Sequence, residues 1–207
     1  MRPSREGYPS IAFTLFMILG SLFFAPIVAL FLVPMLFFVV WYYRDPERSP
    51  EGEGYLSPSD GVVTRVERGE YPVIGKALRI SISTGVMDVH VNRSPCAGSV
   101  GRLVRFPAKM SVGTASSAPR KWEKIIVEIF TNRGPVTVTH SAGFPGRNVT
   151  CGLMKGRELE RGGRYAVIAS GARTDLYLPP DTEPCAAEGG NVFAGRTVLA
   201  LINHGGR

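Results

Sequence analysis

The first part of the chain most constrains its fold, because no charged residue occurs from Gly7 to Tyr43. As one helix this run would reach about 55 Å at about 1.5 Å per residue, well beyond the roughly 30 Å of a bilayer core. Gly20 and Pro26 lie near its middle, where a helix is readily broken. We therefore expect two helices, at about 10–24 and 27–43, that form a tight or re-entrant membrane hairpin within residues 1–45.

Positive charges flank the apolar run on both sides. Arg2 and Arg5 precede it, and Arg44 and Arg48 follow it. The positive-inside rule then predicts that both ends lie at the cytoplasmic face of the cell membrane. A secretory signal peptide is the alternative, but the run is too long for one and the following "YYRDPERSP" is not a small-residue cleavage site.

The sequence pattern changes after a polar linker at 46–54. From residue 55 to 207, short β-branched runs alternate with Gly, Pro and Asp, and no long helical period occurs. This predicts an all-β, or mainly β, domain. The expected strands lie at 61–67, 78–83, 86–91, 99–106, 124–130, 136–140, 148–153, 165–169, 174–178 and 198–202.

An internal repeat supports this fold class. "GRELERGGRYAVI" begins at Gly156 and "GGNVFAGRTVLAL" begins at Gly189. Each predicts a turn, a short crossing segment, a second glycine turn and a strand. Such repeats build the flattened barrel or sandwich of lipoyl- and biotinyl-type domains. Biotinyl domains carry their modified lysine in a Met-Lys-Met hairpin, whereas here "LMKGRE" has Met154 and Lys155 followed by Gly156. Lys155 is interpreted as an ordinary turn lysine, because so short a match is weak evidence.

The net charge indicates which class of partner to expect, and the cysteines indicate whether a metal site is expected. The net charge is +7 and the sequence pI is about 9.6, which favours an anionic partner. With a membrane hairpin on the same chain, we expect a phospholipid surface and no nucleic acid. The basic stretch 102–124 is the candidate lipid-facing surface, although a solvated loop is equally compatible; its basic residues are Arg102, Arg105, Lys109, Arg120, Lys121 and Lys124. The three cysteines have no metal-site spacing, so we expect free thiols and no metal.

Two residues stand out as candidates for chemistry. In "MDVHVNRSP", Asp88 and His90 are two apart and would share one face of a strand, where a carboxylate can orient an imidazole. Asp60, in "SPSDG", is by itself compatible with an ordinary turn before a strand. His140 is expected to be structural, and His204 lies in the C-terminal tail.

Taken in order, several motifs resemble the short form of the phosphatidylserine decarboxylase family. They are "YYRDPER" after the hairpin, "SPSDG", "MDVHVNRSPCAG" and "KGRELERGGRYAVIASGARTDLYLP". The resemblance covers essentially the whole chain. It implies a membrane-bound enzyme of phospholipid biosynthesis that converts phosphatidylserine to phosphatidylethanolamine.

The resemblance also implies a pyruvoyl enzyme made as a proenzyme. In the family, a serine hydroxyl attacks the carbonyl of the preceding glycine, and the chain separates into α and β chains. The serine becomes an N-terminal pyruvoyl group that serves as electron sink during decarboxylation. By position, Gly171 would supply the attacked carbonyl, while Asp60 and His90 would carry the acid/base roles.

Ala172 stands where the family has its processing serine. A methyl group has no Oγ, so the acyl shift cannot start there and the chain is expected to stay inactive. The alanine is either an engineered block, the mark of a divergent relative, or a sign that Ser170 has taken over as nucleophile. Ser170 would lie roughly 6–7 Å away along a strand, which disfavours the last alternative.

Two further departures from the family pattern concern the same site. Arg93 lies where larger relatives have a second histidine, and Ser170 lies where an aromatic residue is usual. The rival function is a non-catalytic, membrane-anchored β module that binds anionic lipid or a partner protein. The sequence leaves the oligomeric state open, with a homodimer among the alternatives.

Overall fold

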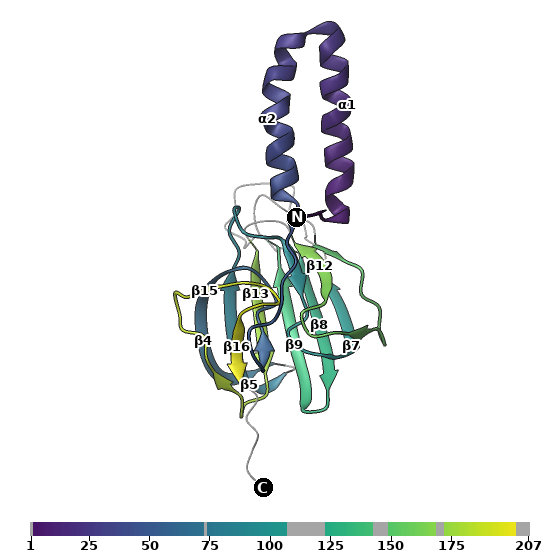
Figure 1. Ribbon diagram of the computed structural model, residues 1–207. Coiled ribbons are helices and arrows are strands. Elements are labelled where there is room, and N and C mark those ends of the chain that lie inside the picture. The colour runs from purple at the N-terminus through teal and green to yellow at the C-terminus, as the bar shows by residue number, and fades with distance from the viewer. Residues whose placement is uncertain (1, 73, 107–122, 143–148, 169–171, 202–207) are drawn as a thin grey trace, which may run out of the picture. The chain divides into compact units, whose positions relative to one another are not determined.

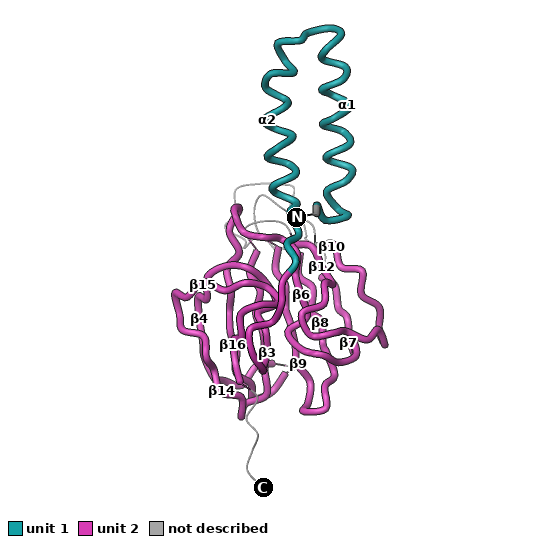
Figure 2. Tube along the Cα trace, in the orientation of Figure 1, with its two compact units in different colours: residues 1–47 teal, residues 48–207 magenta. Residues whose placement is uncertain are grey.

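A computed structural model describes residues 2–72, 74–106, 123–142, 149–168 and 172–201. The chain forms two compact units, residues 1–47 and residues 48–207 (Figure 2). The first is mainly helical and the second is mainly β, which confirms the expected fold class of a β domain preceded by helices.

The first unit is a helical hairpin. Helices α1 (Tyr8–Phe24) and α2 (Pro26–Tyr42) run antiparallel and meet at Ala25, whose non-helical backbone breaks the helix before Pro26 (Figure 1). A short 3₁₀ helix, Arg5–Gly7, precedes α1. The two chain ends of the hairpin pair as β1 (Arg2–Pro3) and β2 (Arg44–Asp45).

Large apolar side chains of this hairpin are exposed within the structure, including Phe24 at 93% and Phe31 at 73%. By length and composition, the helical segment Arg5–Phe24 could cross a membrane, whereas α2 is a shorter apolar helix. An apolar helix surface of this kind is unfavourable in water and needs an apolar environment.

The second unit is built on a curled eight-stranded antiparallel sheet (Figure 1). Its spatial order is β11-β7-β8-β9-β13-β5-β4-β15. In chain order these strands are β4 (Gly61–Tyr71), β5 (Gly75–Ser83), β7 (Gly98–Phe106), β8 (Lys124–Thr131), β9 (Gly134–Ser141), β11 (Glu158–Leu159), β13 (Arg173–Leu178) and β15 (Asn191–Val192).

Two three-stranded sheets close the β core. One has the order β10-β12-β6 and the other β14-β16-β3. Their strands are β3 (Tyr55–Leu56), β6 (Val91–Arg93), β10 (Val149–Cys151), β12 (Arg164–Ile168), β14 (Glu183–Pro184) and β16 (Val198–Leu201).

The alternation of side chains along β8 shows how the large sheet separates two faces. Ile125, Val127 and Ile129 belong to the core cluster and are fully buried. Between them, Lys124, Ile126 and Glu128 face the other side of the sheet. The core itself is made by the first face together with the two small sheets, through residues such as Leu199 and Ile168.

The sequence repeat corresponds to a structural repeat. The first copy contains β11, a turn at Gly162 and β12, and the second contains β15, a turn at Gly195 and β16. An earlier pair of segments, at 57–59 and 94–96, is also equivalent. In each, a serine hydroxyl donates a hydrogen bond to the carbonyl two residues on, Ser57 to Ser59 O at 2.6 Å and Ser94 to Cys96 O at 2.7 Å. The second unit is therefore internally pseudo-symmetric.

Backbone contacts tie the two copies together reciprocally. Leu56 N donates to Pro95 O at 2.9 Å, and Arg93 N donates to Pro58 O at 3.0 Å. Each copy then enters its long strand through a glycine with positive φ, Gly61 at 142° and Gly98 at 159°. A Cβ on Gly61 would lie 2.1 Å from Ser83 O, so only glycine fits where the strand starts.

Most expected strands are present, but the one predicted at 86–91 is wrong. The segment after β5 turns at 86–88, and the strand that follows, β6, starts only at Val91. The Asp88 carboxylate accepts a hydrogen bond from Gly85 N at 2.7 Å and stabilises this turn. Asp88 and His90 therefore do not share one face of a strand.

Candidate active site

Residue 172 lies directly before β13, and its side chain packs into the core. Ala172 is 3% exposed and belongs to the main hydrophobic cluster. Its carbonyl accepts a hydrogen bond from Thr84 N at 2.9 Å. Gly171 and Ser170 lie outside the described residues.

Thr84 connects position 172 to Asp60. The Thr84 hydroxyl donates to the carbonyl oxygen of Asp60 at 2.7 Å, while its backbone N–H holds Ala172. Thr84 is 4% exposed, so both bonds are shielded from water. The structure thus brings Asp60 and Ala172 together through one intervening residue.

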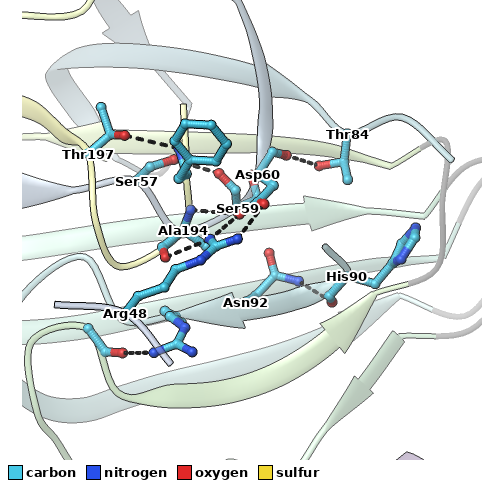
Figure 3. A network of polar contacts seen from close by, with 12 residues as sticks. Arg48, Ser57, Ser59, Asp60, Thr84, His90, Asn92, Ala194 and Thr197 are labelled. Atoms are coloured by element: carbon cyan, nitrogen blue, oxygen red, sulfur yellow. Dashed lines mark hydrogen bonds and ion pairs between the residues drawn. The ribbon is translucent and has the colours of Figure 1, made fainter. Parts of the chain in front are cut away.

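The carboxylate of Asp60 is held on its other side by Arg48 (Figure 3). Arg48 Nη2 donates to Asp60 Oδ2 at 2.7 Å, and Arg48 Nη1 donates to Oδ1 and to Ala194 O. Ala194 N donates to Asp60 Oδ1 at 2.8 Å. The side chains of Arg48 and Asp60 are 11% and 5% exposed, so the ion pair is largely desolvated.

The pseudo-symmetry shows that the fold itself does not need an acid at this position. Asp60 lies three residues after Ser57, and Ala97 lies three residues after Ser94, so the two positions are equivalent. Both segments form the same turn before a glycine. The copy with Ala97 is built without a carboxylate. Asp60 and its ion pair are therefore specific to the half of the domain that contacts residue 172.

His90 is buried, at 3% exposure, just before β6. Its carbonyl accepts a hydrogen bond from Ile168 N at 3.0 Å, and Ile168 ends β12 four positions before Ala172. The imidazole points away from the Arg48–Asp60 pair (Figure 3). The backbone of His90 is thus fixed at the end of the strand that leads towards position 172.

A second polar network lies in the core beside the same strand. His140 is fully buried, with Nδ1 3.1 Å from Thr174 Oγ1 and Nε2 2.5 Å from the Tyr165 hydroxyl. Burial lowers the pKa of His140 to about 3 and raises the pKa of Tyr165 well above its ordinary value. His140 is thus a neutral residue that links β9, β12 and β13.

The neutral state of His140 predicts acid sensitivity. The folded pKa of about 3 lies below the ordinary 6.5, so between these values the unfolded chain binds a proton that the folded chain does not. The free energy of unfolding should then fall, by on the order of 1 kcal/mol for each pH unit, as the pH is lowered from 6.5 towards 3.

Urea unfolding of the full chain in detergent, compared with His140→Gln across this window, measures that contribution. Acidic groups common to both proteins cancel in the difference. Equal slopes for the two proteins would contradict a neutral His140.

The basic residues predicted to face lipid do not form one surface. Arg102 and Lys124 lie on the face of the large sheet opposite the core. Arg105 lies three residues after Arg102 on β7, so its side chain points to the other face of the sheet. There its Nη2 donates to Cys151 O at 2.6 Å and stabilises β10. Lys109, Arg120 and Lys121 lie outside the described residues.

Sequence reasoning missed Arg48 and Thr84. In the sequence Arg48 is one of the positive charges that flank the membrane hairpin, but its side chain is buried against Asp60. The short spacing between "RDPER" and "SPSDG" was the available signal, but it does not say that the two segments pair. Within the described residues no three His, Cys, Asp or Glu side chains gather as a metal site, and Cys96, Cys151 and Cys185 are free thiols.

The profile of a family described as phosphatidylserine decarboxylase matches residues 35–200. A protein named phosphatidylserine decarboxylase proenzyme from Desulfotalea psychrophila is 33% identical over 96% of this chain and 96% of its own length. Proteins of the same name from Symbiobacterium thermophilum and Nitratidesulfovibrio vulgaris are 35% and 36% identical, over 96% and 94% of this chain and 95% and 92% of their own lengths.

Proposed function

The chain belongs to the phosphatidylserine decarboxylase family, and from that premise we propose that it is the family's proenzyme scaffold, kept uncleaved by Ala172. The family converts phosphatidylserine to phosphatidylethanolamine by pyruvoyl-dependent decarboxylation. The observation that carries the proposal is the placement of residue 172. Its carbonyl is held by Thr84 next to Asp60, although the residue itself has no hydroxyl group.

The residue at 172 does not fit the formation of a pyruvoyl group. That group arises from a serine, and the buried methyl of Ala172 offers no oxygen that could attack the preceding carbonyl. No step through a pyruvoyl group is therefore available at residue 172 of this chain. The α and β chains of a processed precursor are expected only after a serine is restored.

Within this scaffold, Asp60 is a positioning residue and His90 is the candidate base. Arg48 and Ala194 occupy the carboxylate oxygens of Asp60, so Asp60 acts on position 172 through its backbone and Thr84. His90 accepts a backbone hydrogen bond from Ile168, the last residue of β12. Ile168 is four residues before Ala172 in the sequence. The imidazole of His90 would take the proton from a serine at 172.

Conversion of phosphatidylserine tests the function directly. The full chain and its Ala172→Ser variant are each incubated with phosphatidylserine in mixed micelles, and phosphatidylethanolamine is quantified by mass spectrometry. We expect no product from the unmodified chain and product from Ala172→Ser. A variant that cleaves itself but forms no phosphatidylethanolamine would refute the assigned substrate.

A second candidate function is favoured by Ala172 itself. A chain without the processing serine could serve as a non-catalytic, membrane-anchored β module for anionic lipid or a protein partner. A correctly folded Ala172→Ser protein that stays uncut would support this alternative. Cleavage of the unmodified chain before Ser170 would instead show that the nucleophile has moved.

The helical hairpin anchors the chain in the cell membrane, with both ends at the cytoplasmic face. Helices α1 and α2 have 17 residues each, and such a helix extends about 25 Å at about 1.5 Å per residue, close to the thickness of a bilayer core. Arg5 precedes α1 and Arg44 follows α2, so positive charge marks both ends.

Cysteine accessibility tests this topology. In a chain with Cys185→Ser, the variants Arg5→Cys and Glu53→Cys should both react with a membrane-impermeant thiol reagent in inside-out vesicles, and neither should react in right-side-out vesicles. A single membrane span would make the two positions reactive from opposite sides. Cys96 and Cys151 are buried and serve as internal background.

A further inference from the structure

A groove of about 750 Å³ lies on the face of the large sheet that does not contact the core. It crosses β7, β8, β9, β13 and β5. On β7 it is lined by Arg102, Val104 and Phe106, and on β8 by Lys124 and Ile126. Thr137 and Thr139 on β9 and Tyr177 on β13 also line it.

The groove is separate from the candidate active site. Along β13, side chains alternate between the two faces of the sheet. Ala172 and Leu176 point into the core cluster, whereas Tyr177 lines the groove. A ligand in the groove would therefore lie across the sheet from the side chain at position 172.

The charges of the groove are predominantly positive. Its lining contains one acidic residue, Glu128, and the basic residues Lys76, Arg79, Arg102, Lys124 and Arg133. Arg79 is compensated by Glu67 at 2.5 Å. Lys76, Arg102 and Lys124 form no ion pair with any other described residue, so the groove keeps an excess of positive charge.

Apolar groups lie directly beside these cations. Phe106 is 49% exposed, and Val104 and Ile126 are partly exposed on the same face. Tyr71 and Tyr177 stack edge to face with ring centroids 5.1 Å apart. A ligand that satisfies the groove needs both an anionic group and an apolar segment.

We propose that this groove binds one single-chain anionic lipid, with a carboxylate or phosphate head among Lys76, Arg102 and Lys124 and its acyl chain along Ile126, Val104 and Phe106. The volume lies within the range of about 300–1,000 Å³ that holds one small ligand. A second copy of the chain is a poorer occupant, because a two-fold contact would place this cationic face against itself.

The proposal does not depend on self-cleavage or decarboxylation. The groove is built by strands of the unmodified chain, and no residue of the Asp60–Thr84 network lines it. Failure of the proposed enzyme function would leave the groove proposal intact, and the reverse also holds.

Photo-crosslinking of the full chain locates the lipid. The chain is reconstituted in phosphatidylcholine nanodiscs with a fatty acid that carries a diazirine on its acyl chain, irradiated and digested, and the labelled peptides are identified by mass spectrometry. We expect labels in β7 and β8, within residues 98–106 and 124–131, and several-fold less label there from the corresponding fatty alcohol. Label confined to residues 8–42 would overturn the proposal, and so would equal labelling by the alcohol.

Charge reversal provides the matched comparison. Arg102→Glu combined with Lys124→Glu should reduce labelling of β7 and β8 roughly tenfold, because two favourable charges become unfavourable. Arg65→Glu combined with Lys155→Glu makes the same net change at exposed residues outside the groove and should leave the labelling unchanged. Equal loss in both double variants would overturn the assignment.

Discussion

Replacing Asp60 by alanine is expected to lower the free energy of unfolding by about 3–5 kcal/mol. The change leaves the guanidinium of Arg48, whose side chain is 11% exposed, without its bidentate carboxylate partner. It also removes the acceptor of Ala194 N–H, another buried donor. Urea unfolding of the full chain in detergent measures the loss, with the protease susceptibility of the β domain as the signal for unfolding.

An exposed ion pair in the same unit gives the control. Arg196 Nε lies 2.6 Å from Glu51 Oε1, but both side chains are more than half exposed. Arg196→Ala should therefore cost only about 0–1 kcal/mol. The double change Arg48→Met with Asp60→Leu should cost less than the sum of the two single changes, since no charge is left buried. Equal losses for Asp60→Ala and Arg196→Ala would contradict the buried pair.

In an Ala172→Ser background, His90→Ala is expected to slow self-cleavage by roughly 10²–10⁴-fold, the usual contribution of a positioned general base. Thr84→Val in the same background should also slow the cut, because the bond to Asp60 O is lost while the bond from Thr84 N to residue 172 remains. Densitometry of SDS gels over time gives the rates, and far-UV circular dichroism checks that each variant is folded.

The pH profile separates the two roles. A base with a titrating imidazole gives a rate that falls at acid pH, and His90→Ala should flatten that limb. A positioning residue changes the rate without changing the profile, so Thr84→Val should retain the limb. A His90→Ala variant that cleaves as fast as its parent would remove His90 from the proposed mechanism.

The sequence predicted the helices, strands and turns whose formation depends on nearby residues. The uncharged run with Pro26 near its middle predicts two helices, and the structure has α1 and α2 within two residues of the expected bounds. The short run rich in β-branched residues from Lys124 to Phe130 predicts β8, which the structure has at Lys124–Thr131. Gly162 and Gly195 marked the repeat, since both turns need positive φ.

The predictions that failed have different physical causes. Val86, Val89 and Val91 resemble a strand, but Asp88 caps a turn through Gly85, and this local bond determines the backbone. The sequence puts Arg105 and Arg102 in one basic stretch, but residues an odd number apart on a strand point to opposite faces, so the two side chains lie on opposite sides of β7. The pairing of Arg48 with Asp60 depends on how the linker packs near Ala194, which no local pattern reports.

The intact mass of the purified chain, with and without Ala172→Ser, tests most directly the claim that the proenzyme is stalled for want of one hydroxyl group. The unmodified chain should give one species near 22.5 kDa. The variant should give two, the smaller of which spans residues 172–207. A cut in the unmodified chain, or a folded Ala172→Ser chain that remains whole, would contradict the claim.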